Sequence, residues 1–247
     1  MFDYQAPTNL LKDRIILVTG SSQGIGRAAA LSYARHGATV VLHGRNQEQL
    51  ETLYDEIVNE GLAEPAITLL DFSQAGFEDF MVMQKSIGDT FGRLDGLLHN
   101  AGILGKRTSI KNTDVKSWHD VMQVNVNAAF MLSKAMMPLL EESHNASVVF
   151  TSSSVGRKGR AYWGSYAVSK FAIEGLMQVM ADELENTSNI RVNSINPGAT
   201  NTYMRRMAYP GEVAGNNPEP EIIMPVYLYL MGDDSLDVNG QALNAQG

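Results

Sequence analysis

Residues 15–38, IILVTGSSQGIGRAAALSYARHGA, decide the fold that we predict for this chain. The stretch opens with a short apolar run rich in β-branched residues, 15–18, which is typical of a buried strand. Three glycines, Gly20, Gly24 and Gly26, come next and lead into apolar residues at helical spacing. Because glycine permits close backbone approach and a helix N-terminus presents free N–H groups, this arrangement predicts a site for an anion such as a pyrophosphate.

The glycine spacing leaves a second interpretation open. It reads G-x-x-x-G-x-G, whereas the common dinucleotide-binding fingerprint reads G-x-G-x-x-G. A loop whose glycines serve only the turn is therefore the alternative to a cofactor site.

The rest of the chain alternates between short apolar runs and amphipathic segments. Further strands are expected at 39–42, 66–70, 94–99, 147–151 and 190–195, with a last one after Gly240, and helices at 46–60, 76–91, 114–142 and 165–186. This alternation predicts a single α/β domain over residues 1–247, with a Rossmann-type, doubly wound parallel sheet of about seven strands flanked by helices. Prolines and glycines in 203–221 predict a lid over the site.

Composition limits the function classes. The chain has no cysteine and five scattered histidines, so thiolate chemistry is excluded and a metal site is not expected. Its net charge of −8 argues against general nucleic-acid binding. No apolar run approaches the roughly 18 residues that span a bilayer, and the N-terminus lacks a signal pattern. We therefore expect a cytoplasmic protein with no nucleic-acid, membrane or metal partner.

A second stretch, residues 153–170, carries groups suited to acid–base chemistry. Tyr166 follows Ser153 by thirteen residues and precedes Lys170 by four, which places Tyr166 and Lys170 on one helical face. An isolated tyrosine has a pKa near ~10, and a neighbouring ammonium group favours the phenolate, so we expect Lys170 to lower the pKa of Tyr166. With the Ser153 hydroxyl on a substrate oxygen, these groups suit the reduction of a carbonyl. Taken alone, Tyr-x-x-x-Lys is also an ordinary helical pair.

The segment after the second predicted strand bears on cofactor choice. Dinucleotide folds often place a carboxylate there for the adenosine ribose, but this chain has Gly44 and Arg45. An arginine at this point can bind a 2′-phosphate, so NADP(H) is favoured and NAD(H) stays possible. A solvent-facing Arg45 is the alternative.

Chemistry-bearing residues fall at the ends of the predicted strands. They are the glycine-rich turn, Asp71, Asn100, Ser153 and the turn Pro197-Gly198. Because open α/β sheets bind ligands along the carboxyl edge, we expect these residues to meet in one site.

In combination, these motifs resemble the short-chain dehydrogenase/reductase family over essentially the whole chain. The matching runs are Thr19-Gly20-x-x-x-Gly24-Ile25-Gly26, Asp71, Asn100-Ala101-Gly102, Asn125, Ser153, Tyr166-x-x-x-Lys170 and Asn196-Pro197-Gly198. Within the family, segments such as LLKDRIILVTG, VMQVNVNA and VFTSSSVGR are most similar to the YciK-type bacterial oxidoreductases.

The resemblance implies a role for each matching position. Tyr166 would be the general acid/base, and Lys170 would lower its pKa and bind the nicotinamide ribose. Ser153, preferred to its neighbours because its spacing to the tyrosine fits the family, would orient the carbonyl. Asn125 would hold a water that links Lys170 to a proton relay. The residues implied in cofactor binding are Gly20, Ser22, Gln23, Gly24, Ile25, Gly26, Arg45, Asp71, Phe72, Asn100, Ala101, Gly102, Tyr166, Lys170, Pro197, Gly198, Thr200 and Thr202.

Two positions depart from the family pattern. Gln23 stands where many NADP-dependent members have a basic residue, which leaves Arg45 as the main phosphate ligand. Gly240 is followed by QALNAQG instead of the usual closing pattern, and a last strand is still expected there.

Basic residues gather at the predicted mouth of the site. Eight of the nineteen lie in three loops at this edge: Lys106, Arg107, Lys111, Arg157, Lys158, Arg160, Arg205 and Arg206. Such a mouth favours an anionic or acyl-carrier-linked carbonyl substrate, and side chains that face solvent or pair with acids are the alternative. Tyr162, Trp163, Met204 and Met207 are candidates to line the pocket, and plain core packing is their alternative.

The leading hypothesis is an NADP(H)-dependent oxidoreductase that interconverts a small-molecule carbonyl and an alcohol by hydride transfer. An NADP(H)-sensing binding protein without turnover is the alternative, although a sensor has no need of Ser153, Tyr166 and Lys170. A dehydratase or epimerase on the same fold is a third interpretation, for which this chain has little room. By resemblance, helices at 114–142 and 165–186 are expected to form the interface of a homodimer or homotetramer.

Overall fold

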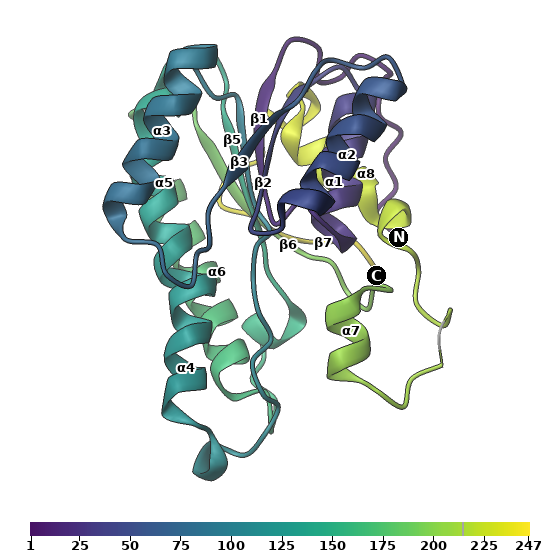
Figure 1. Cartoon of the computed structure of the whole chain (residues 1–247), viewed down its shortest axis with the longest axis vertical. Coiled ribbons are helices and arrows are strands. Elements are labelled where there is room, and N and C mark those ends of the chain that lie inside the picture. The colour runs from purple at the N-terminus through teal and green to yellow at the C-terminus, as the bar shows by residue number, and fades with distance from the viewer. Residues whose placement is uncertain (214) are drawn as a thin grey trace.

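The computed structural model describes residues 1–213 and 215–247 and places one seven-stranded, all-parallel sheet between two layers of helices (Figure 1). The strands are β1 (Ile15–Thr19), β2 (Thr39–Gly44), β3 (Ala66–Leu69), β4 (Gly96–His99), β5 (Ser147–Thr151), β6 (Arg191–Asn196) and β7 (Ala242–Asn244). They lie in the order β3-β2-β1-β4-β5-β6-β7, so the winding reverses between β1 and β4. This sheet confirms the predicted fold class, including the last strand.

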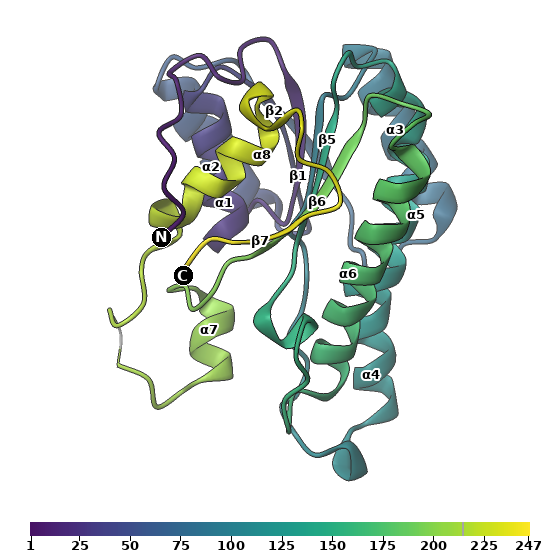
Figure 2. The same ribbon diagram turned by 180° about the vertical axis from the view of Figure 1, so that it is seen from behind.

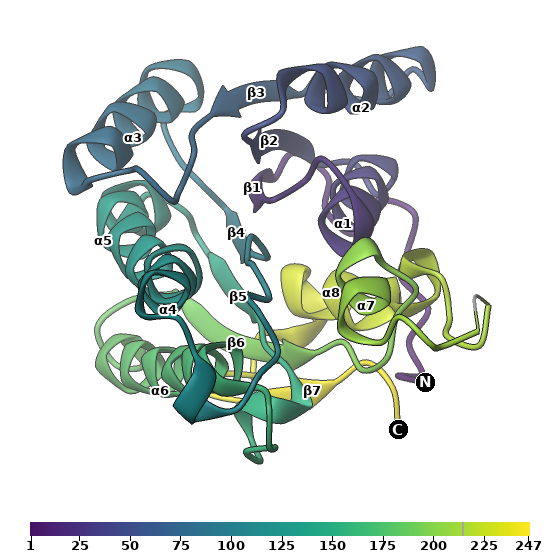
Figure 3. The same cartoon turned by 60° about the horizontal axis from the view of Figure 1, so that its bottom comes forward.

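Helices cover both faces of the sheet. One face carries α1 (Gly24–Arg35), α2 (Gln47–Asn59) and α8 (Met224–Met231), and the other carries α3 (Phe77–Phe91), α5 (Ala128–Glu141) and α6 (Gly164–Leu184) (Figures 2 and 3). Two further helices, α4 (Val115–Met122) and α7 (Tyr203–Ala208), lie beyond the carboxyl edge of the sheet (Figure 1).

Successive residues of a strand serve the two opposite cores. In β1, Ile16 and Val18 pack in the α1 and α8 core, whereas Leu17 packs in the α3 and α5 core. All three side chains are fully buried. Parallel strands that are covered on both faces have continuous apolar sequences, and for this reason the strands could be predicted from the apolar runs.

The predicted helix at 114–142 needs a correction. The structure divides it into α4, a π-helical segment at Gln123–Asn127, and α5. The wider turn accompanies side-chain bonds from Asn125 to the backbone of Ile103, which lies outside the helix. Apolar spacing continues unbroken across this region, so the sequence pattern does not reveal the interruption.

The predicted lid, 203–221, contains α7 and the start of a 3₁₀ turn at Pro220–Ile223, and its residue 214 lies outside the described residues. Figure 3 shows α7 on the side of the sheet that α1 and α8 cover. Among the described helices, none combines the length and the apolar character needed to cross a membrane.

Candidate active site

The turn between β1 and α1 has a backbone that suits only glycine at key positions. Gly20 and Gly24 have φ angles of 66° and 56°, in the left-handed region. A Cβ on Gly26 would lie 2.2 Å from the Gly20 carbonyl oxygen and 2.5 Å from the Asn100 amide nitrogen. At the carboxyl edge of the sheet, the turn therefore exposes backbone that no side chain covers, and a cofactor pyrophosphate could approach it closely.

The first turn of α1 presents backbone N–H groups to the same place. Its N-cap residue, Gln23, makes no side-chain capping bond within the described part of the chain, and the first turn holds no acidic residue. These donors and the positive end of the helix dipole suit an anion. Thr202 lies against the turn, with its Cγ2 3.4 Å from where a Cβ on Gly24 would be. Ser22 and Ile25 are half-buried in the turn.

Hydrogen bonds lock the glycine-rich turn to the loop after β4. Thr19 Oγ1 accepts from the backbone N–H groups of Asn100 and Ala101, at 2.9 and 3.0 Å. In return, Asn100 Nδ2 donates to the carbonyl oxygens of Thr19 and Gly20, at 3.2 and 3.3 Å. The predicted residues at the ends of β1 and β4 thus form one unit.

His43, at the end of β2, supports the same turn and was not predicted to have a role. Its Nδ1 accepts from the Gly20 N–H at 3.4 Å, its Nε2 lies 3.1 Å from the Leu70 carbonyl oxygen, and its ring stacks on Phe72 at 4.2 Å. Burial lowers the pKa of His43 to about 4, so the ring is neutral and Nε2–H is the donor. A lone histidine in a strand gives no sequence signal for this function.

Arg45 and Asp71 lie at the ends of β2 and β3, where an adenosine moiety would bind. Asp71 accepts from the Ser73 N–H at 2.9 Å, and this bond, together with the nearby Arg45 charge, holds the carboxyl pKa below its ordinary value. Arg45 is exposed. A cation therefore faces solvent at this corner of the site, beside a carboxylate that stays ionised.

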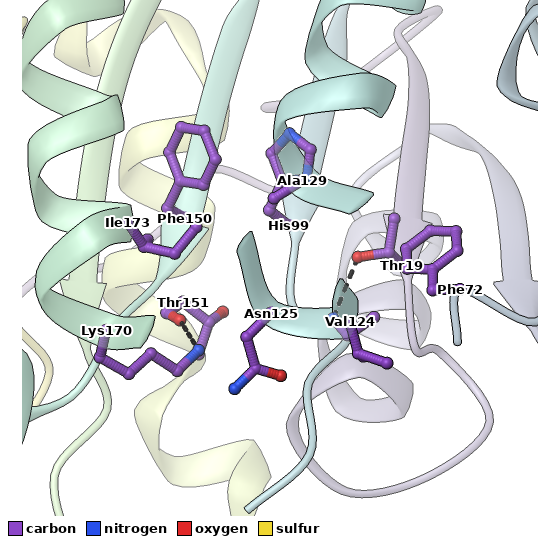
Figure 4. Close-up of a pocket in the computed structure, with 11 residues that line it drawn as sticks. Thr19, Phe72, His99, Val124, Asn125, Ala129, Phe150, Thr151, Lys170 and Ile173 are labelled. Atoms are coloured by element: carbon purple, nitrogen blue, oxygen red, sulfur yellow. Dashed lines mark hydrogen bonds between the residues drawn. The ribbon is translucent and has the colours of Figure 1, made fainter. Parts of the chain in front are cut away.

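The structure brings Ser153, Tyr166 and Lys170 together at the end of β5. Ser153 Oγ accepts from the Val155 N–H at 3.4 Å, and the Ser153 side chain is close enough to Tyr166 to influence the pKa of its phenol. Lys170 Nζ donates to the Thr151 carbonyl oxygen at 2.7 Å (Figure 4). It also lies 5.7 Å from the centre of the Tyr166 ring. Of the neighbouring serines, Ser152 is buried and Ser154 is exposed.

The expected effect of Lys170 on Tyr166 is wrong for the protein alone. Burial raises the pKa of Tyr166 to about 12, and the neighbouring Ser153 side chain only partly opposes this. Burial also lowers the pKa of Lys170 to about 8, with the charge of Glu174 acting in the opposite direction. Removing two neighbouring groups from water costs their charged forms more than their mutual attraction restores.

Asn125 lies on the π-helical segment, with its side chain fully engaged. Its Oδ1 accepts from the Ile103 N–H at 2.8 Å, and its Nδ2 donates to the Ile103 carbonyl and to Ser169 Oγ, each at 3.0 Å. Gly102 lies between Asn125 and Lys170, and a Cβ there would be 3.3 Å from Asn125 Oδ1 and 3.8 Å from Lys170 Nζ. Both side chains border a cavity of about 10 Å³, roughly the size of one water (Figure 4).

The turn after β6 is fastened by the C-terminal residues. Gln246 Nε2 donates to the carbonyl oxygens of Pro197 and Ala199, at 2.8 and 2.9 Å. Gly198 has a φ of 72°, and Thr200 is buried beside Pro197. Sequence reasoning assigned no role to Gln246, because its partners are almost fifty residues away.

An apolar wall lies next to the catalytic candidates. Leu104, Trp163 and Met204 pack against Val155 and Tyr166. Two predicted pocket residues, Trp163 and Met204, therefore line this wall. The other two are placed differently, because Tyr162 is 62% exposed and Met207 is 57% exposed.

The predicted basic mouth is partly neutralised. Arg157 pairs with buried Glu174 at 3.1 Å and donates to the Leu243 carbonyl oxygen, so it fastens α6 to the C-terminal segment. Arg205 makes a two-pronged ion pair with Glu212, at 2.6 and 2.7 Å. The structure therefore corrects the expectation that all the basic residues of these loops form one positive mouth. The members that stay exposed are Lys106, Lys111, Lys158, Arg160 and Arg206.

The chain is similar to known proteins over most of its length. A family model described as short chain dehydrogenase matches residues 14–212. The chain is 52% identical to the uncharacterized oxidoreductase YciK of Escherichia coli (strain K12), over 98% of this chain and 96% of that protein. This likeness confirms the subgroup that the sequence motifs resemble.

Solved structures are equally similar. A short chain dehydrogenase from Salmonella enterica serovar Typhi superposes with a TM-score of 0.97 at 52% identity, over 99% of this chain and all of that one. A chain from Shigella flexneri 2a str. 301, described as a short chain dehydrogenase complexed with NADP, has a TM-score of 0.95 at 51% identity. That match covers 98% of this chain and 100% of the other.

Proposed function

The chain belongs to the short chain dehydrogenase family, and on that premise we propose that it is an NADP(H)-dependent oxidoreductase that interconverts a carbonyl compound and an alcohol. The observation that carries the proposal is the grouping of Ser153, Tyr166 and Lys170 at the end of β5, with the Lys170 ammonium group 5.7 Å from the Tyr166 ring centre. A bound nicotinamide supplies or accepts the hydride.

Side chains of the protein orient and protonate the substrate oxygen in this proposal. In reduction, Tyr166 donates its proton to the carbonyl oxygen while the Ser153 hydroxyl orients that oxygen. A pKa of about 12 keeps Tyr166 protonated at neutral pH, which suits a proton donor. Lys170 and Asn125 border a cavity that has room for a water, through which a proton can return toward Tyr166.

NADP(H) is the proposed cofactor because Arg45 offers an exposed cation at the end of β2. The NADP complex of the similar Shigella protein supports this choice. Gly44 is a buried glycine at the neighbouring position, where a ribose-binding carboxylate would otherwise stand. The glycine-rich turn and the uncapped start of α1 fit the pyrophosphate.

We test this with titrations of NADPH and NADH, followed by nicotinamide fluorescence, in the native chain and in Arg45→Ala. Loss of a charge-assisted bond should weaken NADPH binding by roughly tenfold to hundredfold and leave NADH binding unchanged. Equal weakening of both cofactors would contradict the assigned phosphate contact. Tight NADPH binding without turnover of any carbonyl in a broad panel would favour the NADP(H)-sensing alternative.

The apolar wall indicates what part of a substrate the site accepts. Leu104, Trp163 and Met204 offer no charge beside Tyr166, so the reacting half of the substrate is uncharged and apolar. An anionic group or an acyl carrier would lie farther out, against the five basic residues that stay exposed. If so, rising salt weakens kcat/KM for the carrier-linked substrate but not for a short neutral ketone.

A homodimer or homotetramer is part of the proposal. Exposed apolar side chains follow one another along α6 at helical spacing, namely Val168, Phe171 and Val179, and Phe130 lies on the neighbouring α5. Burial of such a patch between subunits would remove it from water. Light scattering of Phe171→Glu should show smaller particles than the native chain.

A further inference from the structure

Three loops that surround Tyr166 meet at the guanidinium group of Arg107. The Arg107 Cζ lies 4.6 Å from the ring centre of Trp163, at the start of α6, and 4.8 Å from that of Tyr209, just after α7. The two rings are 5.9 Å apart and tilted by 51°, so the guanidinium occupies the angle between them. Cations over aromatic faces attract strongly where water is excluded.

Hydrogen bonding ties the same side chain to α7. Arg107 Nη1 donates to the carbonyl oxygen of Ala208, the last residue of that helix. Arg107 Nε is buried and has no hydrogen-bond partner among the described residues. The guanidinium is therefore held by the Trp163 and Tyr209 rings and by the Ala208 carbonyl oxygen. Tyr209 and Ala208 belong to the predicted lid, and Trp163 belongs to the apolar wall beneath it.

Tyr209 is held on its other side as well. The Cζ of Arg205 lies 4.0 Å from the Tyr209 ring centre, and Glu212 fixes that guanidinium from behind. Arg160 Nη1 reaches the Tyr209 hydroxyl at 3.3 Å. Tyr209 is thus the point where the lid is fastened to the body of the protein.

The contacts around Arg107 and Tyr209 continue through Trp163 to Tyr166, the proposed proton donor. The Trp163 ring lies 5.8 Å from the Tyr166 ring, and Met204 of α7 packs in the same apolar cluster. Tyr166 is only 8% exposed in this arrangement. Movement of α7 away from Arg107 would therefore uncover Tyr166.

We propose that Arg107 is a positioning residue that latches α7 and Tyr209 closed over Tyr166, rather than a ligand for a substrate anion. Its planar guanidinium fits the angle between two rings, and a lysine ammonium would keep the charge but lose the stacked shape. Two cation–π contacts and a charged hydrogen bond correspond to roughly tenfold to hundredfold in the ratio of closed to open lid. Only the kinetic consequence rests on the proposed function.

Tryptophan fluorescence tests the latch without any turnover. The chain has two tryptophans, so Trp118→Phe leaves Trp163 as the single reporter. In that background, Arg107→Ala and Arg107→Lys should both raise the acrylamide quenching constant of Trp163 severalfold. Lys134→Ala is the matched control, because it removes a cation 5.0 Å from the Phe77 ring, far from the lid. Unchanged quenching in Arg107→Ala would overturn the proposal.

Kinetics separates the latch from an anion site. With NADPH and a carbonyl that the native chain reduces, the latch predicts that Arg107→Lys loses nearly as much kcat/KM as Arg107→Ala, roughly tenfold or more. Arg107→Lys activity near the native value would show that charge alone matters and would overturn the latch. A chain that reduces no carbonyl would refute the proposed function, yet the quenching result would still decide the latch.

Discussion

The two edges of the sheet bury charged groups in different ways. At the amino edge, Arg14 and Arg191 are 7% and 6% exposed, and the Nη atoms of both guanidinium groups donate to several protein acceptors. At the carboxyl edge, Lys170 is also 6% exposed, but its one hydrogen bond among the described residues goes to the Thr151 carbonyl oxygen. At the amino edge the charged groups have several hydrogen-bond acceptors each, whereas at the carboxyl edge the Lys170 ammonium group has one among the described residues.

This difference distinguishes a structural network from the proposed active site. Asp95, at the amino edge, accepts from Ile15 N–H at 2.8 Å and from Ser143 Oγ at 2.6 Å, and it pairs with Arg93 at 3.0 Å. Such a carboxylate stabilises the fold because all of its lone pairs have partners. Burial lowers the pKa values of Arg14 and Arg191 at the amino edge as well, but at the carboxyl edge it lowers the pKa of Lys170 to about 8, close to neutral pH, and raises that of Tyr166 to about 12, so the tyrosine keeps its proton.

The largest expected effect is on activity, at the carboxyl edge. Tyr166→Phe removes the proposed proton donor and should lower kcat for carbonyl reduction by about 10²–10⁴-fold. The melting temperature should hardly change, because the ring still fills its place in the apolar cluster. Steady-state kinetics and thermal unfolding of the same preparation check both parts. Retention of more than about a tenth of the native kcat would contradict the assigned role.

The features that could be predicted from the sequence are those set by residues close together in the chain. Three glycines after an apolar run are enough to place a turn, and Tyr166 and Lys170 are four residues apart on one helix. The sequence did not predict contacts between residues that are far apart in the chain and meet only in the folded protein. The partner of Arg157 is Glu174 on another element, and the support of the glycine-rich turn by His43 needs two strands to be side by side. Burial, which shifts the Tyr166 pKa upward, is likewise a property of the packed molecule.

The next effect is on stability, at the amino edge. Asp95→Ala leaves the Ile15 N–H and Ser143 without their acceptor and should lower the free energy of unfolding by about 3 kcal/mol. For a chain of this length, that corresponds to a melting temperature lower by roughly 6–12 °C. The kcat of the protein that remains folded should stay at the native value. Glu60→Ala, which removes only an exposed pair with Arg35, is the control and should change little.

The smallest effect is a pH dependence that belongs to the carboxyl edge alone. Burial lowers the pKa of Lys170 from its ordinary 10.5 to about 8, so its charge is lost above that pH. We expect kcat/KM for reduction to fall about tenfold per pH unit above about 8, while Tyr166, with a pKa of about 12, stays protonated. Because the Glu174 charge raises the pKa of Lys170, Glu174→Gln should move the inflection to lower pH.

The same shift has a consequence for stability, with the sign fixed by linkage. Between about pH 8 and 10.5 the unfolded chain holds the Lys170 proton more often than the folded one, so this group makes the free energy of unfolding rise with pH. Tyr166 acts in the opposite direction above pH 10, because its folded-state pKa is raised. Chemical denaturation at pH 7.5 and pH 9.5, in the native chain and in Lys170→Met, isolates the lysine as the difference between the two slopes. If stability changes equally with pH in the native chain and in Lys170→Met, or if the inflection in kcat/KM persists in Lys170→Met, the pKa of Lys170 is not near 8. The contrast between the two edges would then rest on Tyr166 alone.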